Sequence, residues 1–142
     1  MSFTDTQSSI TIENIAGITE STIINYFATI NQEKFERTAA LFAEEGELLA
    51  PFTKPIVGRD AIATYLAQEA KGMELLPIKG TNESVENDLQ LFKITGKVNT
   101  PLFSVNVCWH FTLNKYREIT TVRIKLLASP QELLGLKKIK DS

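Results

Sequence analysis

Three chemically distinctive residues stand next to one another in the stretch VNVCWHFTLN, which runs from Val105 to Asn114. Cys108, Trp109 and His110 are the only cysteine, tryptophan and histidine of the chain. A thiol beside an imidazole could form a nucleophile with its general base. A tryptophan offers a large apolar surface and one N–H donor, which suits a pocket for an apolar ligand with one oxygen. The stretch therefore raises two alternatives, a reactive centre or a binding pocket.

The alternation of apolar and polar residues in this stretch predicts a strand and separates the three residues. Successive side chains of a strand point to opposite faces, so Trp109 points away from both Cys108 and His110. We expect helices to cover the face of Trp109, whereas the other face is semi-polar and offers no pocket. One cysteine and one histidine also cannot complete a tetrahedral metal site. The pattern favours a structural or subunit-interface role for Cys108 and His110, and predicts no catalytic or metal site.

Tyr26 and Trp109 are the better candidates for chemistry. Each has an apolar body and one polar hydrogen, so each could donate a hydrogen bond to a single oxygen of an apolar ligand in a pocket. The alternative is that both are core aromatics whose polar atoms already have partners, and composition and periodicity alone favour this alternative.

Three helices are expected to position these residues. Apolar residues at helical spacing predict a helix over ITESTIINYFATINQ, with Thr19 as its N-cap and Tyr26 on or beside the apolar stripe. The segment EKFERTAALFAEEG repeats the pattern, and Gly46 is expected to end this second helix. A third helix is expected over residues 59–70.

Strands follow the helices along the chain. A short strand is expected over residues 47–50, and after Met73 the period changes from helical to alternating. The segments LQLFKITGKVNT, FSVNVCWHFTL and REITTVRIKLLAS predict further strands, NKYR a hairpin turn, and SPQELLGL a short helix. This order indicates an α+β fold, with the helices gathered on one face of a strongly bent antiparallel sheet.

The composition is that of one globular domain. Within 142 residues we expect a flexible arm over residues 1–17, a single domain over 18–136 and a tail over 137–142. A formal charge of −2 without a basic cluster argues against nucleic acid as a partner. The chain has neither a secretory signal nor a membrane-spanning stretch, which predicts a cytoplasmic protein. A single cysteine allows a disulfide only between two copies.

Several motifs together resemble the C-terminal domain of the cyanobacterial orange carotenoid protein. They are NYFATIN, FERTAALFAEEGELLAPFTKPIVGRDAIATYL, ITGKVNTPLF, NVCWHFTLN and LLASPQELLGL, and the resemblance covers about residues 15–136. It implies a fold like nuclear transport factor 2, a cone of curved antiparallel sheet with helices enclosing an apolar cavity. It also implies that Tyr26 and Trp109 donate hydrogen bonds to the keto oxygen of a carotenoid ring. The cavity walls implied by the resemblance are Val57, Met73, Leu75, Thr100, Pro101, Phe103, Ile124 and Leu126.

The sequence departs from the full-length family in three respects. It shows no N-terminal helical domain, so we expect a free-standing homologue of the C-terminal domain. Leu102 stands where the family tends to have a tryptophan, which removes one aromatic wall, and the loop that follows is shorter by several residues. Glu69 matches a glutamate that pairs with the missing domain, and is expected either to meet a partner in trans or to be exposed.

The resemblance implies a binding protein rather than an enzyme. We expect it to solubilise a keto-carotenoid of the canthaxanthin or echinenone type and to transfer it to helical carotenoid proteins, with singlet-oxygen quenching in photoprotection. The expected partners are a second copy when loaded, a helical protein like the missing N-terminal domain, and a membrane as transient carotenoid source. The expected location is the cytoplasm of a cyanobacterial cell, near thylakoid membranes.

Two alternatives stay open. The same cone fold hosts isomerases and dehydratases, which would use Tyr26 in the pocket with an acid or histidine partner. Two points argue against this alternative. His110 is expected to point to the outer face of the sheet, and no acidic residue is obvious on the inner face. The second alternative is a dimerisation module without a ligand.

Overall fold

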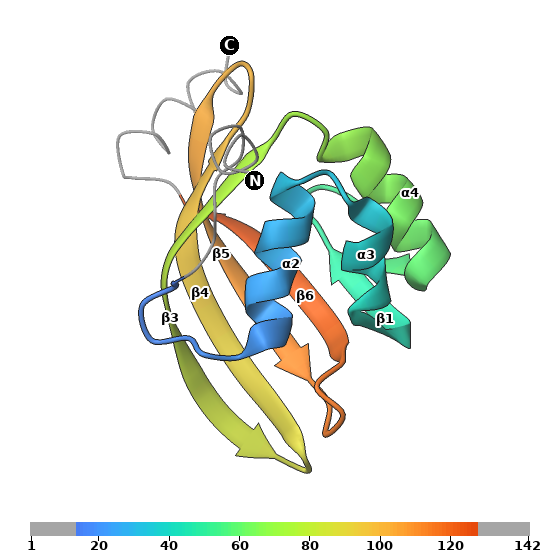
Figure 1. The fold of residues 1–142 in the computed structure, drawn as a ribbon, viewed down its shortest axis with the longest axis vertical. Helices are drawn as coiled ribbons and strands as arrows, with labels where there is room; N and C mark the ends of the chain where they lie inside the picture. Colours follow the sequence, from blue (N-terminus) through green and yellow to red (C-terminus); the bar gives the residue numbers. More distant parts are fainter. Residues whose placement is uncertain (1–13, 128–142) are drawn as a thin grey trace, which may run out of the picture.

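The computed structural model describes residues 14–127, and Figure 1 shows a strongly curved sheet with helices packed on its concave side. The α+β class and the bent sheet with helices on one face, both expected from the sequence, are confirmed. The short helix expected at SPQELLGL lies outside the described residues. The elements in chain order are α2 (Ser21–Asn31), α3 (Phe35–Ala40), β1 (Phe42–Leu49), β2 (Ile56–Val57), α4 (Arg59–Glu69), β3 (Glu74–Glu86), β4 (Leu89–Asn99), β5 (Ser104–Leu113) and β6 (Ile119–Leu127).

The strands of the described range form one six-stranded sheet in the order β2-β1-β6-β5-β4-β3. The long strands β3 to β6 pair antiparallel, as the alternating segments predicted. One pair differs, because β1 runs parallel to β6. The two edge strands of this order, β2 and β3, do not pair with each other, so the sheet does not close on itself, and the helices cover its concave face. No helix in this range is long and apolar enough to cross a membrane.

The second predicted helix is wrong over its C-terminal half. The helix α3 ends at Ala40, and the chain enters strand β1 at Phe42 rather than at residue 47. Gly46 does not end a helix but lies inside β1, where the register with β6 shifts between Phe42 and Glu47. A side-chain carbon at Gly46 would lie 2.8 Å from the carbonyl oxygen of Ile119. Pairing with a distant strand thus overrides the local helical pattern.

The helix α2 begins one residue later than predicted. Its N-cap is Glu20 rather than Thr19, because the Glu20 carboxylate accepts a hydrogen bond from the backbone N–H of Thr22 at 3.3 Å. The Thr22 hydroxyl then donates to the carbonyl oxygen of Arg117 at 2.9 Å. The start of α2 is therefore bonded to the turn between β5 and β6, which sets its height over the sheet.

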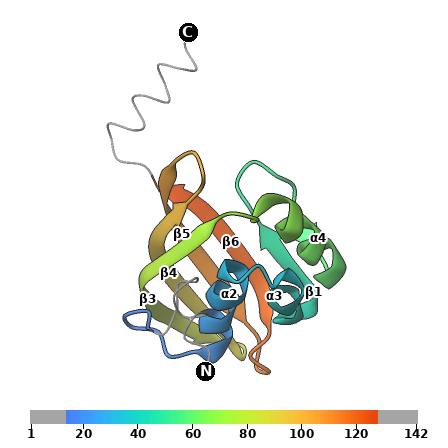
Figure 2. The same cartoon turned by 45° about the horizontal axis from the view of Figure 1, so that its top comes forward.

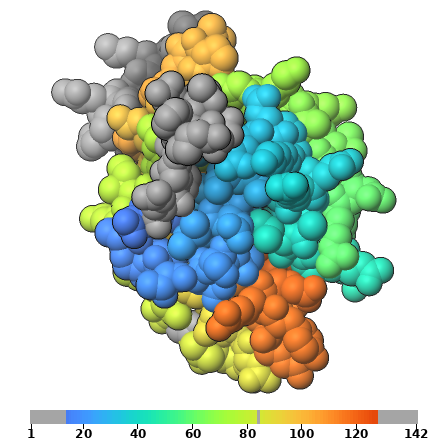
Figure 3. Space-filling model, viewed as in Figure 1, coloured from blue at the N-terminus to red at the C-terminus, as the bar shows by residue number. Residues whose placement is uncertain are grey.

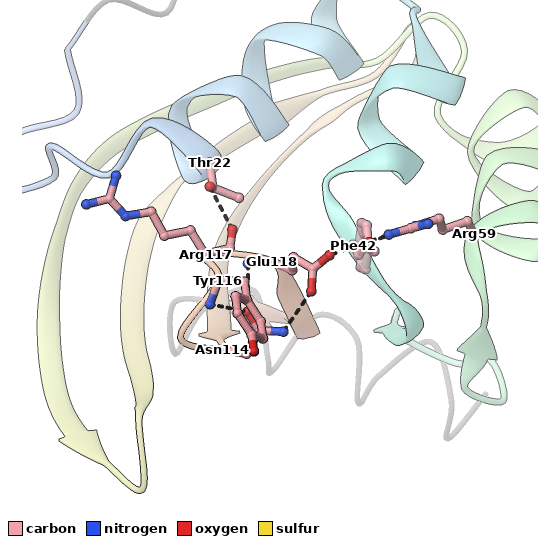
Figure 4. A network of polar contacts seen from close by, with 7 residues as sticks. All are labelled: Thr22, Phe42, Arg59, Asn114, Tyr116, Arg117 and Glu118. Carbon is pink, nitrogen blue, oxygen red and sulfur yellow. Dashed lines mark hydrogen bonds and ion pairs between the residues drawn. The ribbon is translucent and has the colours of Figure 1, made fainter.

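The same turn joins neighbouring elements through a network of polar contacts (Figure 4). The side-chain oxygen of Asn114 accepts hydrogen bonds from the N–H groups of Tyr116 and Glu118, at 2.9 and 3.0 Å. The Glu118 carboxylate lies 3.6 Å from Arg59 at the start of α4, and Arg59 also donates to the carbonyl of Phe42 at 2.9 Å. Two helices and two strands are thereby joined at this end.

Aromatic rings on the concave face fix α2 against the sheet. The ring of Phe27 lies edge-to-face with Trp109 at 4.7 Å between centroids, and Tyr26 meets Phe111 edge-to-face at 5.0 Å. All four side chains are at most 1% exposed. Edge-to-face pairs stabilise beyond the burial of their area, so they orient Trp109 as well as hold the helix.

The first described residues lie against the edge strand β3. Ile15 is buried, and Ala16 bonds the backbone of β3 on both sides, donating to Ile78 at 3.2 Å and accepting from Gly80 at 2.8 Å. Gly17 adopts a positive φ of 87° to make the turn that follows. The arm, domain and tail boundaries at residues 17 and 136 stay predictions.

Candidate functional site

A cavity of about 660 Å³ opens between α2, α4 and the concave face of the sheet. Its size falls in the range of small-molecule sites, which are mostly apolar with a few polar groups. Eight of the ten predicted site residues line it: Tyr26, Met73, Leu75, Thr100, Phe103, Trp109, Ile124 and Leu126. Ten of the twelve further lining residues are apolar or aromatic; the twelve are Ile30, Leu48, Ala50, Pro51, Tyr65, Leu66, Glu69, Ala70, Val98, Ser104, Val105 and Val107.

Tyr26 and Trp109 reach this cavity from opposite layers, the first from α2 and the second from the middle of β5. Neither the Tyr26 hydroxyl nor the Trp109 N–H makes a hydrogen bond to another residue of the described range. No buried polar side-chain atom in that range lacks a partner. Tyr26 and Trp109 both line the cavity.

The Tyr26 hydroxyl stays protonated over the physiological pH range. Burial raises its pKa well above the ordinary value for tyrosine, and the nearby Tyr65 raises it further. A neutral phenol buried in this way can donate a hydrogen bond but cannot act as a base near neutral pH. The Tyr26 O–H and the Trp109 N–H are therefore two hydrogen-bond donors on residues that line one cavity.

Val57 and Pro101 do not line the cavity. Val57 pairs with Glu47 in β1, whereas its neighbour Ile56 pairs with the buried Leu48, which does line the cavity. Because side chains alternate along a strand, Val57 points to the outer face and is 53% exposed. Pro101 lies exposed in the turn between β4 and β5. Their contact with a ligand stays a prediction.

Several lining residues that sequence reasoning missed carried a readable signal. Ile30 follows Tyr26 by one helical turn. Val105 and Val107 lie four and two residues before Trp109, so their side chains point to the same face of β5. Ala50 and Pro51 follow the end of β1, outside any periodic segment, so no pattern in the sequence points to them.

One side of the cavity carries an acid. Glu69 lies on α4 one turn after Tyr65, and both residues line the cavity. Burial raises the pKa of Tyr65, and the Glu69 carboxylate raises it further. The expectation that the cavity has no inner acid is therefore corrected. Glu69 is itself exposed, so it lies at the rim rather than at the base of the cavity.

Cys108 and His110 lie on the opposite, convex face, as the alternation predicted. The Cys108 sulfur lies 3.3 Å from Nε2 of His110. Cys108 is nevertheless only 2% exposed, and burial raises the pKa of its thiol although Lys93 and Lys125 lower it. A buried thiol of raised pKa is a poor nucleophile. Within the described residues no group of three or more potential metal ligands occurs.

Comparison with known proteins gives three related findings. The chain is 40% identical over 126 residues to the orange carotenoid-binding protein of Limnospira maxima, covering 86% of this chain and 40% of the relative. The structure of the Anabaena (Nostoc) sp. PCC 7120 orange carotenoid protein binding canthaxanthin matches with a TM-score of 0.82 and 40% identity, over 92% of this chain and 42% of that chain. An NTF2-like protein with a cystatin-like fold from Novosphingobium aromaticivorans matches with a TM-score of 0.64 and 18% identity, over 81% of this chain and 84% of that chain.

No protein-family model matches the chain. The chain spans about two fifths of the length of the orange carotenoid-binding relative that it matches. The match is therefore to one domain of a longer protein, and the more distant NTF2-like structure shows the fold alone.

Proposed function

We propose that this chain, a homologue of the C-terminal domain of the orange carotenoid-binding proteins, binds a carotenoid and acts in photoprotection. The observation that carries the proposal is that Tyr26 and Trp109, two residues with one hydrogen-bond donor each, line an apolar cavity of about 660 Å³. Carotenoids are almost wholly apolar, so burial in this cavity stabilises the complex by about 25 cal/mol per Å² of apolar area. One conjugated keto oxygen accepts from both donors, which selects keto-carotenoids of the canthaxanthin or echinenone type.

One cavity covers only one end of so long a ligand. A carotenoid has a ring at each end of a rigid polyene, and a ring placed against Tyr26 and Trp109 leaves the other end outside the mouth. A second copy presents an identical cavity, so the loaded form is a symmetric homodimer.

The wider role is carrying the pigment between sites. The protein takes a keto-carotenoid from a membrane, keeps it in solution, and transfers it to helical carotenoid proteins like the N-terminal domain of the longer relatives. The bound polyene quenches singlet oxygen. This role places the protein in the cytoplasm of a cyanobacterial cell, near thylakoid membranes.

Purification from a host that makes keto-carotenoids tests the proposal. The expected product is a coloured dimer with a visible carotenoid band. A host that makes only hydrocarbon carotenoids is the matched control, and should give weak loading because such pigments lack the carbonyl acceptor. A colourless product from the keto-carotenoid host, with the fold intact by circular dichroism, would contradict the proposal.

The second candidate is an isomerase or dehydratase that uses Tyr26. Glu69 and Tyr65 on the cavity wall favour it, because an acid beside a protonated tyrosine is a combination used for proton transfer in enzyme sites. Turnover of a steroid or polyketide substrate that is lost in both Tyr26→Phe and Glu69→Gln would support this candidate. No turnover, together with pigment uptake, would exclude it.

A further inference from the structure

Two polar residues on the cavity wall have no part in holding a carbonyl between Tyr26 and Trp109. Six of the lining residues carry a nitrogen or oxygen in the side chain, namely Tyr26, Tyr65, Glu69, Thr100, Ser104 and Trp109. The Thr100 hydroxyl donates to the carbonyl oxygen of Phe103 at 2.9 Å, and the Ser104 hydroxyl donates to the side-chain oxygen of Asn99. These two donors are used within the structure, which leaves Tyr65 and Glu69.

Tyr65 and Glu69 lie together on α4. They are four residues apart, so their side chains leave the same side of the helix. Figure 2 shows α4 on the same side of the sheet as α2, which carries Tyr26, and Figure 3 shows the green residues of α4 at the molecular surface. The Tyr65 ring is half-buried and packs against the core, whereas Glu69 is exposed. The two residues therefore extend from the interior of the cavity to its rim.

Electrostatic effects place Tyr65 between Tyr26 and Glu69. Burial is the main cause of the raised pKa of Tyr26, and Tyr65 raises this pKa further. Burial also raises the pKa of Tyr65, and the Glu69 carboxylate adds to the increase. Because such charge effects weaken with distance, the three groups follow one another along the cavity wall. Both phenols keep their protons at neutral pH and stay able to donate a hydrogen bond.

The four groups offer a ligand two kinds of polar contact. The Tyr26 O–H and the Trp109 N–H are donors, which match a carbonyl oxygen because that oxygen only accepts. Tyr65 and Glu69 combine an O–H donor with a carboxylate acceptor. A ligand hydroxyl both accepts and donates, so it matches this second pair. The cavity wall is therefore complementary to a ring that carries a carbonyl with a hydroxyl beside it.

We propose that Tyr65 and Glu69 are specificity-determining residues, which bind a hydroxyl group on the ring carbon next to the carbonyl. The Tyr65 O–H donates to the oxygen of this hydroxyl, and the Glu69 carboxylate accepts its hydrogen. Keto rings with and without the hydroxyl both enter the cavity, but the hydroxyketone ring binds more tightly, by roughly three- to tenfold. This inference rests on the proposed function for the carotenoid nature of the ligand.

Competitive loading tests the preference. Canthaxanthin and astaxanthin are matched ligands, because both carry a keto group on each ring and only astaxanthin carries a hydroxyl on the neighbouring carbon. Pigment-free protein is mixed with an excess of both pigments, in equal amounts, in detergent micelles, and the bound pigments are separated by chromatography. The wild type should hold roughly three- to tenfold more astaxanthin than canthaxanthin. Equal amounts, or an excess of canthaxanthin, would overturn the proposal.

Substitutions on α4 assign the preference to the two residues. Tyr65→Phe removes the O–H donor and Glu69→Leu removes the carboxylate, so each should bring the ratio of bound pigments toward one. Gln68→Leu and Tyr116→Phe are matched controls that should keep the wild-type ratio, since Gln68 and Tyr116 are exposed and neither lines the cavity. A purely structural defect lowers the binding of both pigments together. A wild-type ratio in both Tyr65→Phe and Glu69→Leu would therefore overturn the proposal.

Ring fragments separate this proposal from the proposed function. The keto derivative of β-ionone and the corresponding hydroxyketone carry the two ring types without the polyene. Trp109 is the only tryptophan of the chain, so its fluorescence reports their binding. Tighter binding of the hydroxyketone fragment, lost in Tyr65→Phe, by a protein that takes up neither carotenoid would support this proposal and contradict the proposed function. Loading of both carotenoids without any preference, and equal binding of both fragments, would do the reverse.

Discussion

The two faces of β5 have opposite surroundings although their residues alternate along one strand. On the concave face Trp109 packs against Phe27 and borders an apolar cavity. On the convex face Cys108 and His110 contact each other, and both lie within the electrostatic influence of Lys93 and Lys125. The difference shows that three rare neighbours in sequence do not form one site. The concave face combines packing with ligand binding, and the convex face contributes neither to the cavity nor to the aromatic cluster.

The largest expected difference between the faces is in stability. Phe111→Ala removes a fully buried ring that meets both Tyr26 and Phe27, and should lower the free energy of unfolding by about 3–5 kcal/mol. Thr112→Ala changes the next residue, which is half-buried on the convex face, and should cost well under that. Urea unfolding of both variants measures the difference. Equal losses would contradict the assignment of the core to the concave face.

A smaller effect concerns the reactivity of the convex face. Cys108 is the only thiol, is 2% exposed and has a raised pKa, so the folded protein should react with a disulfide reagent at pH 8 at least roughly tenfold more slowly than the unfolded chain. Absorbance of the released thiolate follows the rate. Similar rates in the folded and the urea-unfolded protein would show that this part of the sheet is open to solvent.

The smallest expected effect is a pH dependence from His110. Burial lowers the pKa of this histidine, and Lys93, Lys125 and Arg123 on the neighbouring strands lower it further while Glu83 opposes them. The unfolded chain therefore binds the proton first as pH falls. The stability that His110 contributes is present above about pH 6.5 and is lost as pH falls through its folded pKa.

His110→Gln should remove this component. The free energy of unfolding of wild type and variant, measured from pH 8 to pH 5, should then differ in slope only below about pH 6.5. Parallel curves over the whole range would contradict the lowered pKa.

The sequence was informative wherever a periodic segment was long. The alternation of β5 correctly predicted both faces, and helical spacing correctly predicted α2 and α4. The boundary between α3 and β1 was missed because β1 depends on pairing with β6, some 75 residues away in the chain, which no local pattern reports. Glu69 was missed as a cavity residue because the side of α4 that faces the cavity depends on how this helix packs.

The candidate site, like the fold, was predictable only in part. Tyr26 and Trp109 were chosen because each combines an apolar body with one donor, and the structure brings both to one cavity. Val57, a cavity wall implied by the resemblance, pairs with Glu47 in a strand of only two residues and is not among the residues that line the cavity. Short strands and turns are thus where sequence reasoning about the site was weakest.

The visible absorption spectrum of a donor-deleted variant tests the central claim most directly. Tyr26→Phe with Trp109→Phe removes both donors, each worth about 0.5–1.5 kcal/mol, and keeps aromatic bulk in the cavity. Tyr116→Phe is the control, since it deletes the same hydroxyl far from the cavity. Purified from a keto-carotenoid host, the double variant should show a shifted or absent carotenoid band while the control matches the wild type. A double variant whose band equals that of the wild type in position and yield would contradict the account.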